Sequence, residues 1–267
     1  MIIDGNYFNI RFNKKFGQNF ITDKNLLAAI AADAGVTKDD VVLEIGAGAG
    51  TLTAALADKA KEVVAYEIDE NLRSVLSVTL QDKPNVTVVY EDFMKSTRPL
   101  PSPFKVVANL PYYVTTPILM RLLEGDDRPE SVTVMVQKEV AERLVAKPGT
   151  EEYGAITASV DLVANAKITR IVGRQNFTPP PNVDSAVVRV DLTEKGYSKE
   201  EIAAARKLIR AAFNMRRKTL SNALAGALGG KERAAEIIEK AGFAPSVRGE
   251  TLSAADFIRL VKASESA

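Results

Sequence analysis

Short hydrophobic runs alternate with amphipathic stretches along most of the chain. Runs rich in Val and Ile recur at 41–45, 62–67, 86–90, 104–108, 131–136, 167–173 and 184–191. Strands that alternate with helices are typical of an α/β sheet, and continuous apolar runs such as VVLEI suit parallel strands covered on both faces. The last two runs alternate and flank the turn-rich FTPPPNVD, which favours an antiparallel edge pair. We therefore predict a mixed, mostly parallel seven-stranded sheet.

After residue 191 the pattern becomes helical only. Ser198 followed by Glu201 is typical of a capping box, and apolar residues recur behind it at helical spacing. A second helix is expected to end before Gly242, and a third to open at Ser253. The predicted organisation has three parts: an N-terminal arm at 1–24, an α/β domain at 25–194 and a small all-α domain at 195–267.

Composition narrows the chemistry that is possible. The 267-residue chain has no Cys and no His, so disulfides, thiolate metal sites, a histidine base and the commonest zinc ligand are all excluded. No apolar run approaches the length that spans a bilayer, and the start lacks the basic-then-apolar order of a signal peptide. We expect a soluble, cytoplasmic protein with no bound metal and no membrane partner.

Basic residues are concentrated in two segments, although the net charge is only +1. From Ser198 to the end, thirteen Lys or Arg face eight Asp or Glu, a net of +5 that leaves −4 for the rest. An acid-free window there holds Arg206, Lys207, Arg210, Arg216, Arg217 and Lys218, and near the start Arg11, Lys14 and Lys15 stand among Phe12 and Phe16. Both segments suit nucleic acid. A solvated helix face and a tail packed on the core are the plainer alternatives.

Polar residues at the ends of three strands predict a cofactor site. The first strand runs into Gly46, Gly48 and Gly50, in an E-x-G-x-G-x-G pattern whose spacing argues against a pyrophosphate cradle. Glu67 ends the second strand, where a carboxylate can accept hydrogen bonds from both ribose hydroxyls, and Asp92 follows the third, where one can meet an adenine amino group. Ligands of open α/β sheets lie across these strand ends, so we expect a nucleoside cofactor.

The fourth strand runs into the turn Asn109-Leu110-Pro111-Tyr112, which suits work on an aromatic amine. The adenine amino group is a poor nucleophile, because its lone pair is delocalised into the ring. The Asn109 side-chain oxygen and a backbone carbonyl could accept both N–H hydrogens and aim that lone pair, while Tyr112 offers a stacking ring. Phe177 could supply a second ring or be an ordinary core residue, and the turn itself could simply end the strand.

Several motifs together resemble one family. The segments KKFGQNFITD, EIGAGAGTLT, NLPYYVTTP, QKEVAERLVAKPGTEEYGAIT, FTPPPNVDSAVVRV and FNMRRKTLSNAL occur in an order similar to that of the ribosomal small-subunit RNA adenine dimethyltransferases, over about residues 14–260. The resemblance implies a Rossmann-type class I methyltransferase domain followed by a small helical domain. It also implies dimethylation of two adjacent adenines in a hairpin near the 3′ end of small-subunit (16S) rRNA, during late ribosome biogenesis.

The resemblance further implies partners and site residues. S-adenosyl-L-methionine would be the methyl donor, S-adenosyl-L-homocysteine the product, and rRNA within a partly assembled 30S-type particle the substrate. Nothing in the sequence requires more than one subunit, so we expect a monomer. The expected cofactor contacts are Gln18, Asn19, Ile21, Gly46, Gly48, Glu67, Ile68, Asp92, Phe93 and Asn109. The expected target-amine site is Asn109, Leu110, Pro111, Tyr112 and Phe177, and the expected RNA contacts are Arg11, Lys14, Lys15, Arg206, Arg210, Arg216, Arg217 and Lys218.

Three other interpretations stay open. A large-subunit rRNA adenine methyltransferase of the macrolide-resistance type would use the same chemistry, although FNMRRKT and FTPPPNVDS favour the small-subunit family. A catalytically silent RNA-binding assembly factor is disfavoured by intact Glu67, Asp92 and NLPY. A DNA adenine methyltransferase usually has a proline where this chain has Leu110.

Overall fold

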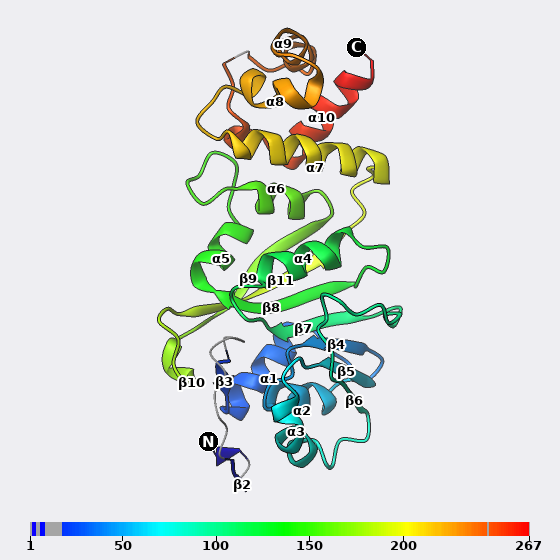
Figure 1. Ribbon diagram of the computed structural model, residues 1–267, viewed down its shortest axis with the longest axis vertical. Coiled ribbons are helices and arrows are strands. Elements are labelled where there is room, and N and C mark those ends of the chain that lie inside the picture. Colours follow the sequence, from blue (N-terminus) through cyan, green and yellow to red (C-terminus); the bar gives the residue numbers. More distant parts are fainter. Residues whose placement is uncertain (1, 4–5, 9–17, 245, 267) are drawn as a thin grey trace. The chain divides into compact units, whose positions relative to one another are not determined.

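The computed structural model describes residues 2–3, 6–8, 18–244 and 246–266, shown in Figure 1. The chain forms two compact units, one from Met1–Ala141 with Lys167–Leu192 and the other from Glu142–Ala166 with Thr193–Ala267. These bounds differ from the expected ones, because residues 142–166 group with the C-terminal helices. The buried Tyr153 hydroxyl, for example, donates to the Leu252 carbonyl at 2.8 Å.

The first unit is built on a seven-stranded sheet in the order β6-β5-β4-β7-β8-β11-β9. Its strands are β4 (Val41–Ile45), β5 (Glu62–Tyr66), β6 (Val86–Val89), β7 (Lys105–Asn109), β8 (Ser131–Gln137), β9 (Ala164–Val172) and β11 (Ser185–Leu192). Neighbours from β6 to β8 pair in parallel, whereas β11 is antiparallel to β8. The predicted mixed, mostly parallel sheet is therefore confirmed.

The expected pair of strands lies at one edge of the sheet, where β11 lies between β8 and the edge strand β9. Ser185 to Val188 are successive buried residues, which a strand with one solvated face would not show. The alternation in SAVVRVDL is therefore confined to its second half, where Arg189 and Asp191 form an ion pair at 2.7 Å.

Helices and two short ribbons complete the first unit. The helices are α1 (Lys24–Asp33), α2 (Thr51–Ala57), η2 (Glu70–Leu72), α3 (Arg73–Thr79), α4 (Thr115–Glu124), the start of α5 (Lys138–Leu144) and η3 (Arg174–Asn176). The ribbons pair β1 (Ile2–Ile3) with β2 (Asn6–Tyr7), and β3 (Phe20–Ile21) with β10 (Phe177–Thr178). The second ribbon brings residues from opposite ends of the unit side by side, with Phe177 opposite Ile21.

The second unit is helical. It contains α6 (Ala155–Asp161), α7 (Lys199–Asn214), α8 (Leu220–Leu228), α9 (Lys231–Lys240), η4 (Gly249–Thr251) and α10 (Ala254–Glu265). The expected capping boxes at Ser198 and Ser253 are confirmed, and Gly242 follows α9 with a φ of 82°. Helix α8 was not predicted, because its N-cap Thr219 makes no side-chain capping bond and its sequence LSNALAGAL lacks a charged face. No helix in the described ranges has the length and apolar character needed to cross a membrane.

Candidate active site

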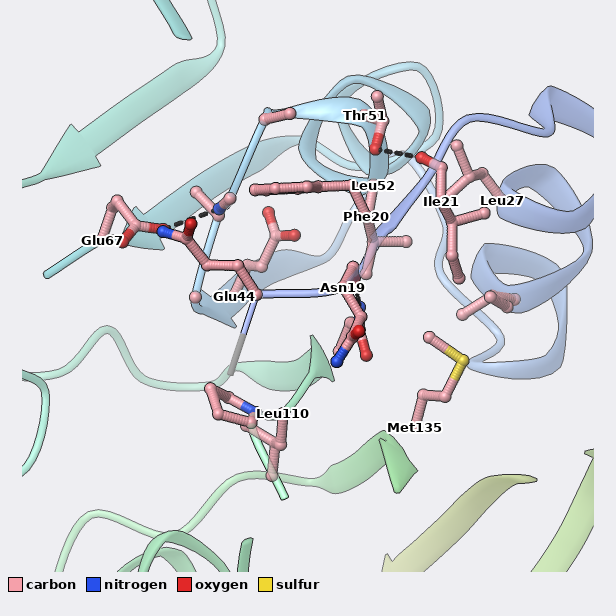
Figure 2. Close-up of a pocket in the computed structure, with 18 of the residues that line it drawn as sticks. Asn19, Phe20, Ile21, Leu27, Glu44, Thr51, Leu52, Glu67, Leu110 and Met135 are labelled. Carbon is pink, nitrogen blue, oxygen red and sulfur yellow. Dashed lines mark hydrogen bonds between the residues drawn. The ribbon is translucent and has the colours of Figure 1, made fainter. Parts of the chain in front are cut away.

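A pocket opens where β4, β5 and β7 end. Its lining comes from four segments of the first unit: residues 18–21, residues 46–52, residues 67–68 and residues 109–113, with Leu27, Ile30, Glu44 and Met135 behind them (Figure 2). The space between protein atoms is about 840 Å³, a figure that includes open solvent. The carboxyl ends of neighbouring parallel strands therefore converge on one pocket, as expected.

The glycine turn after β4 forms one wall of this pocket. Gly46 and Gly48 have positive φ values of 85° and 57°, which residues with a Cβ rarely adopt. A Cβ on Gly48 would also lie 3.1 Å from the ring of Phe20, which crosses the turn from β3. The Thr51 hydroxyl donates to the Ile21 carbonyl at 2.7 Å, so the segment at 18–21 is tied to the start of α2.

Glu67 closes the second side of the pocket. It is 5% exposed, and its two carboxylate oxygens accept the backbone N–H groups of Gly48 at 2.7 Å and Asp69 at 2.8 Å. Burial raises the pKa of Glu67, and these two hydrogen bonds oppose that effect. Each carboxylate oxygen retains a second lone pair, so Glu67 can still accept hydrogen bonds from a ligand. Gln18, which also lines the pocket, donates from Nε2 to the Asp69 carboxylate at 2.8 Å.

A second acid, Glu44, lies in the same lining and was not among the predicted site residues. It is 1% exposed, and its Oε2 has no hydrogen-bond partner in the part of the chain that the structure describes. Burial raises the pKa of Glu44 to about 8; the nearby Thr53 hydroxyl lowers it, and the Glu67 carboxylate raises it. The described lining has these two carboxyl groups and neither Lys nor Arg, so its electrostatics favour a cationic ligand.

The turn after β7 holds its polar groups in fixed orientations. Asn109 Nδ2 donates to the Asn19 carbonyl at 3.1 Å. Because a carbonyl oxygen only accepts hydrogen bonds, the amide nitrogen of Asn109 must face Asn19. The amide oxygen Oδ1 therefore points away from Asn19. The Leu110 N–H donates to the Met135 carbonyl at 3.2 Å, and the Pro111 carbonyl accepts from the Val114 N–H at 3.1 Å. The turn is thus rigid at both ends.

Two tyrosines follow one another at the pocket. The Tyr112 hydroxyl is hydrogen-bonded to the Ser185 hydroxyl at 2.9 Å, and burial raises the pKa of Tyr112 so that the phenol stays neutral. Its ring lines the pocket, as predicted. Tyr113 also lines the pocket but is 60% exposed, and sequence analysis missed it because NLPYY was judged on its first tyrosine.

Most of the predicted site residues do meet in this pocket. The lining contains Gln18, Asn19, Ile21, Gly46, Gly48, Glu67, Ile68, Asn109, Leu110, Pro111 and Tyr112. Three predicted residues lie outside the lining. Asp92 and Phe93 belong to the turn after β6, where the Phe93 ring packs edge-on against Tyr66 at 5.3 Å. Phe177 is 4% exposed and belongs to the hydrophobic core beside Ile21.

The basic residues of the acid-free window fall into three groups. Arg206 is 6% exposed, because it shares the inward face of α7 with Ile202 and Ile209, and this burial contradicts its expected RNA contact. Arg216 is ion-paired with Glu250 at 2.6 Å and donates to the Glu151 carbonyl at 2.8 Å. The exposed members are Lys207, Arg210, Arg217 and Lys218, and the predicted Arg11, Lys14 and Lys15 lie outside the described residues.

Known proteins share this arrangement. Residues 9–265 match the family model for ribosomal RNA adenine dimethylase. The chain is 43% identical to ribosomal RNA small subunit methyltransferase A of Clostridium acetobutylicum, over 95% of this chain and 94% of the relative. It is 45% identical to the protein of that name in Lachnoclostridium phytofermentans, over 96% and 92%.

Solved structures agree with these sequence matches. A dimethyladenosine transferase from Plasmodium falciparum superposes with a TM-score of 0.80 at 26% identity, over 91% of this chain and 96% of that one. The 23S rRNA methyltransferase ErmE superposes with a TM-score of 0.73 at 28% identity, over 92% and 100%. These superpositions over nearly the whole chain confirm the Rossmann-type methyltransferase fold.

The buried acid Glu44 predicts how stability depends on pH. Its pKa is about 8 in the folded chain against an ordinary 4.5, so its stabilising effect is complete below about pH 4.5 and is lost as the pH rises through 8. Glu44→Gln removes this titration. We expect the melting temperature of the wild type to fall between pH 5 and 8.5 by at least about 3 °C more than that of the variant.

The matched control is Glu62→Gln, which changes an exposed glutamate at the start of β5. It should show the wild-type pH dependence. Parallel melting curves for wild type and Glu44→Gln across this pH range would contradict the assignment of a neutral, buried carboxyl group.

Proposed function

Because the chain belongs to the ribosomal RNA adenine dimethylase family, we propose that it dimethylates the N6 amino groups of two adjacent adenines in small-subunit rRNA. The proposed substrate is a hairpin near the 3′ end, within a partly assembled 30S-type particle, and the proposed active form is a monomer. Relatives named small subunit methyltransferase A support this choice of RNA. The observation that carries it is the Asn109 side chain, fixed through Asn19 beside a pocket for a cationic cofactor.

The pocket fits S-adenosyl-L-methionine in shape and charge. Gly46 and Gly48 leave room that a Cβ would fill, and Glu67 lies where it can accept hydrogen bonds from ribose hydroxyls. Glu44 adds a buried oxygen without a partner, in a described lining that has no basic side chain. When bound, the sulfonium cofactor supplies an activated methyl group and a neutral thioether leaving group, S-adenosyl-L-homocysteine. Asp92 and Phe93 are proposed to hold its adenine end.

The Asn109 turn is proposed to prepare the target amine. Asn109 Oδ1 would accept one N–H hydrogen of the adenine amino group. The Leu110 carbonyl would accept the other, since the Pro111 carbonyl is already occupied by Val114 and Thr115. These two bonds draw the nitrogen toward sp³ geometry and aim its lone pair, so that rate enhancement comes from positioning and electrostatics. The methylated nitrogen is strongly acidic until it loses its proton, so no histidine base is required.

Aromatic rings would hold the extruded base. Tyr112 is positioned by its bond to Ser185, so its ring can stack on the adenine with little loss of entropy. Phe177 packs beside Ile21, and a role as the second ring would require it to move out of the core. The exposed Tyr113 is a stacking surface that needs no such movement.

The substrate assignment is tested by methylation of purified ribosomal particles. With radiolabelled cofactor, we expect undermodified small subunits to be methylated at least about a hundredfold faster than large subunits or naked DNA. Mass spectrometry of the digested rRNA should place two methyl groups on each of two adjacent adenines near the 3′ end. Equal labelling of large subunits would contradict the small-subunit assignment, and efficient labelling of free rRNA would contradict the need for a particle.

The proposed role of Asn109 predicts a specific loss of activity. Asn109→Ala removes both the contact with Asn19 and the acceptor for the target amine, and we expect the methylation rate to fall by about 10² to 10³. The melting temperature should change by no more than a few degrees. The exposed Asn165→Ala is the control and should keep full activity. A near-wild-type rate for Asn109→Ala would overturn the mechanism.

The exposed basic pair predicts a change in RNA binding alone. Arg217→Gln with Lys218→Gln should weaken RNA binding and lower the slope of log K against log salt by about 2, because two phosphate contacts are lost. The same charge change in Lys231→Gln with Arg233→Gln, on α9, is the matched control. Arg216 is left intact, since its ion pair with Glu250 is structural. An unchanged slope would make the pair part of an ordinary solvated surface.

A further inference from the structure

Arg121, on α4, joins the helix to the turn that follows β6. Its Nη1 donates to the Phe93 carbonyl at 2.6 Å and its Nη2 to the Ser96 carbonyl at 2.7 Å. The guanidinium carbon lies 4.7 Å from the centre of the Phe93 ring. Arg121 is half-buried and lies outside the pocket lining, so it contacts the turn rather than a ligand.

The turn itself is a single helical turn that starts at Asp92. The N–H groups of Lys95 and Ser96 both donate to the Asp92 carbonyl, at 2.9 and 3.0 Å, and Asp92 Oδ1 accepts the Met94 N–H at 2.9 Å. Within this turn the Phe93 carbonyl also accepts the Ser96 N–H, at 3.3 Å. Arg121 donates to the Phe93 and Ser96 carbonyls at once, which requires a planar fork and not merely a positive charge. Arg121 is therefore bonded directly to the turn that carries Asp92.

The other end of α4 is anchored to the target-base turn. The Thr115 hydroxyl donates to the Pro111 carbonyl at 3.3 Å, and the Val114 N–H donates to the same carbonyl. One ten-residue helix, about 15 Å long, thus connects the NLPY turn to the Asp92 turn. A rigid helix with a tie at each end fixes the distance between the two turns.

We propose that Arg121 is a positioning residue that makes the pocket selective for adenine in the cofactor. It would do so by holding the Asp92 carboxylate where the adenine 6-amino group arrives. The inference rests on the proposed function, because it takes S-adenosyl-L-methionine as the cofactor and Asp92 as the acceptor for its adenine. An alternative role, a phosphate contact with RNA, is disfavoured because both terminal nitrogens already bond to backbone carbonyls.

The test measures selectivity between two ligands that differ at one position. S-adenosylhomocysteine has the 6-amino group, and S-inosylhomocysteine has an oxygen there. We expect the wild type to bind the adenosyl form more tightly. Arg121→Lys keeps the charge and loses the fork, so its affinity for the adenosyl form should fall about tenfold while its affinity for the inosyl form changes less than twofold. Retained inosyl binding shows that the pocket is still folded.

A double variant shows whether Arg121 acts through Asp92. Asp92→Ala alone should lose the same selectivity, and Arg121→Lys with Asp92→Ala should lose no more than either variant alone. Arg128→Lys is the matched control, because Arg128 lies just beyond α4 and bonds only to the Gly125 carbonyl, at 3.3 Å, among the described contacts. It should keep wild-type selectivity. Arg121→Gln is the second variant and should match Arg121→Lys.

The outcomes separate this inference from the function on which it rests. If the wild type prefers the adenosyl ligand and Arg121→Lys prefers it to the same degree, the inference about Arg121 is overturned and the proposed function is not. A loss of RNA affinity with unchanged ligand selectivity would also overturn it and would assign Arg121 to RNA. A wild type that binds neither ligand would overturn the proposed cofactor, and the inference with it.

Discussion

The hydrogen bond from the Asn109 side chain to the Asn19 carbonyl connects the two halves of the active site. Asn109 ends a central strand of the sheet, whereas Asn19 precedes the short strand β3, which pairs with β10. Because Asn19 offers only an acceptor there, the amide of Asn109 has a single favourable orientation. The acceptor needed for an amine is therefore directed by a segment that also lines the cofactor pocket. Cofactor site and target site share one structural element.

Charge in the pocket supports the same conclusion. Glu67 is stabilised by two backbone N–H groups, whereas Glu44 has an oxygen without a partner among the described residues. Two buried carboxyl groups without a basic neighbour are not both ionised at low cost, so one of them is neutral near pH 7. A positively charged ligand would stabilise the negative charge of these carboxyl groups. The pocket is therefore better suited to a sulfonium cofactor than to a nucleotide with a pyrophosphate.

The sheet was predictable from the sequence because its strands are covered on both faces and appear as uninterrupted apolar runs. The glycine turn, the strand-end acids and the capping boxes at Ser198 and Ser253 were also predictable, because each depends on residues close in sequence. The grouping of residues 142–166 with the C-terminal helices was not predictable, since it depends on contacts between distant segments. Helix α8 was missed because small residues such as Gly226 weaken its periodicity.

The arginine side chains show that a basic sequence pattern does not by itself identify the residues that contact RNA. Three of them, Arg121, Arg206 and Arg216, are held within the protein: one by two carbonyls, one by burial in α7 and one by Glu250. The acid-free basic window made Arg206 and Arg216 candidates for RNA contact, yet the exposure of each side chain depends on partners that lie elsewhere in the chain. Arg216 stands beside Arg217 in the same acid-free window, and only Arg217 is exposed. Nucleic-acid contact is therefore a property of exposure and partners, which the fold decides, and the basic window only limits where to look.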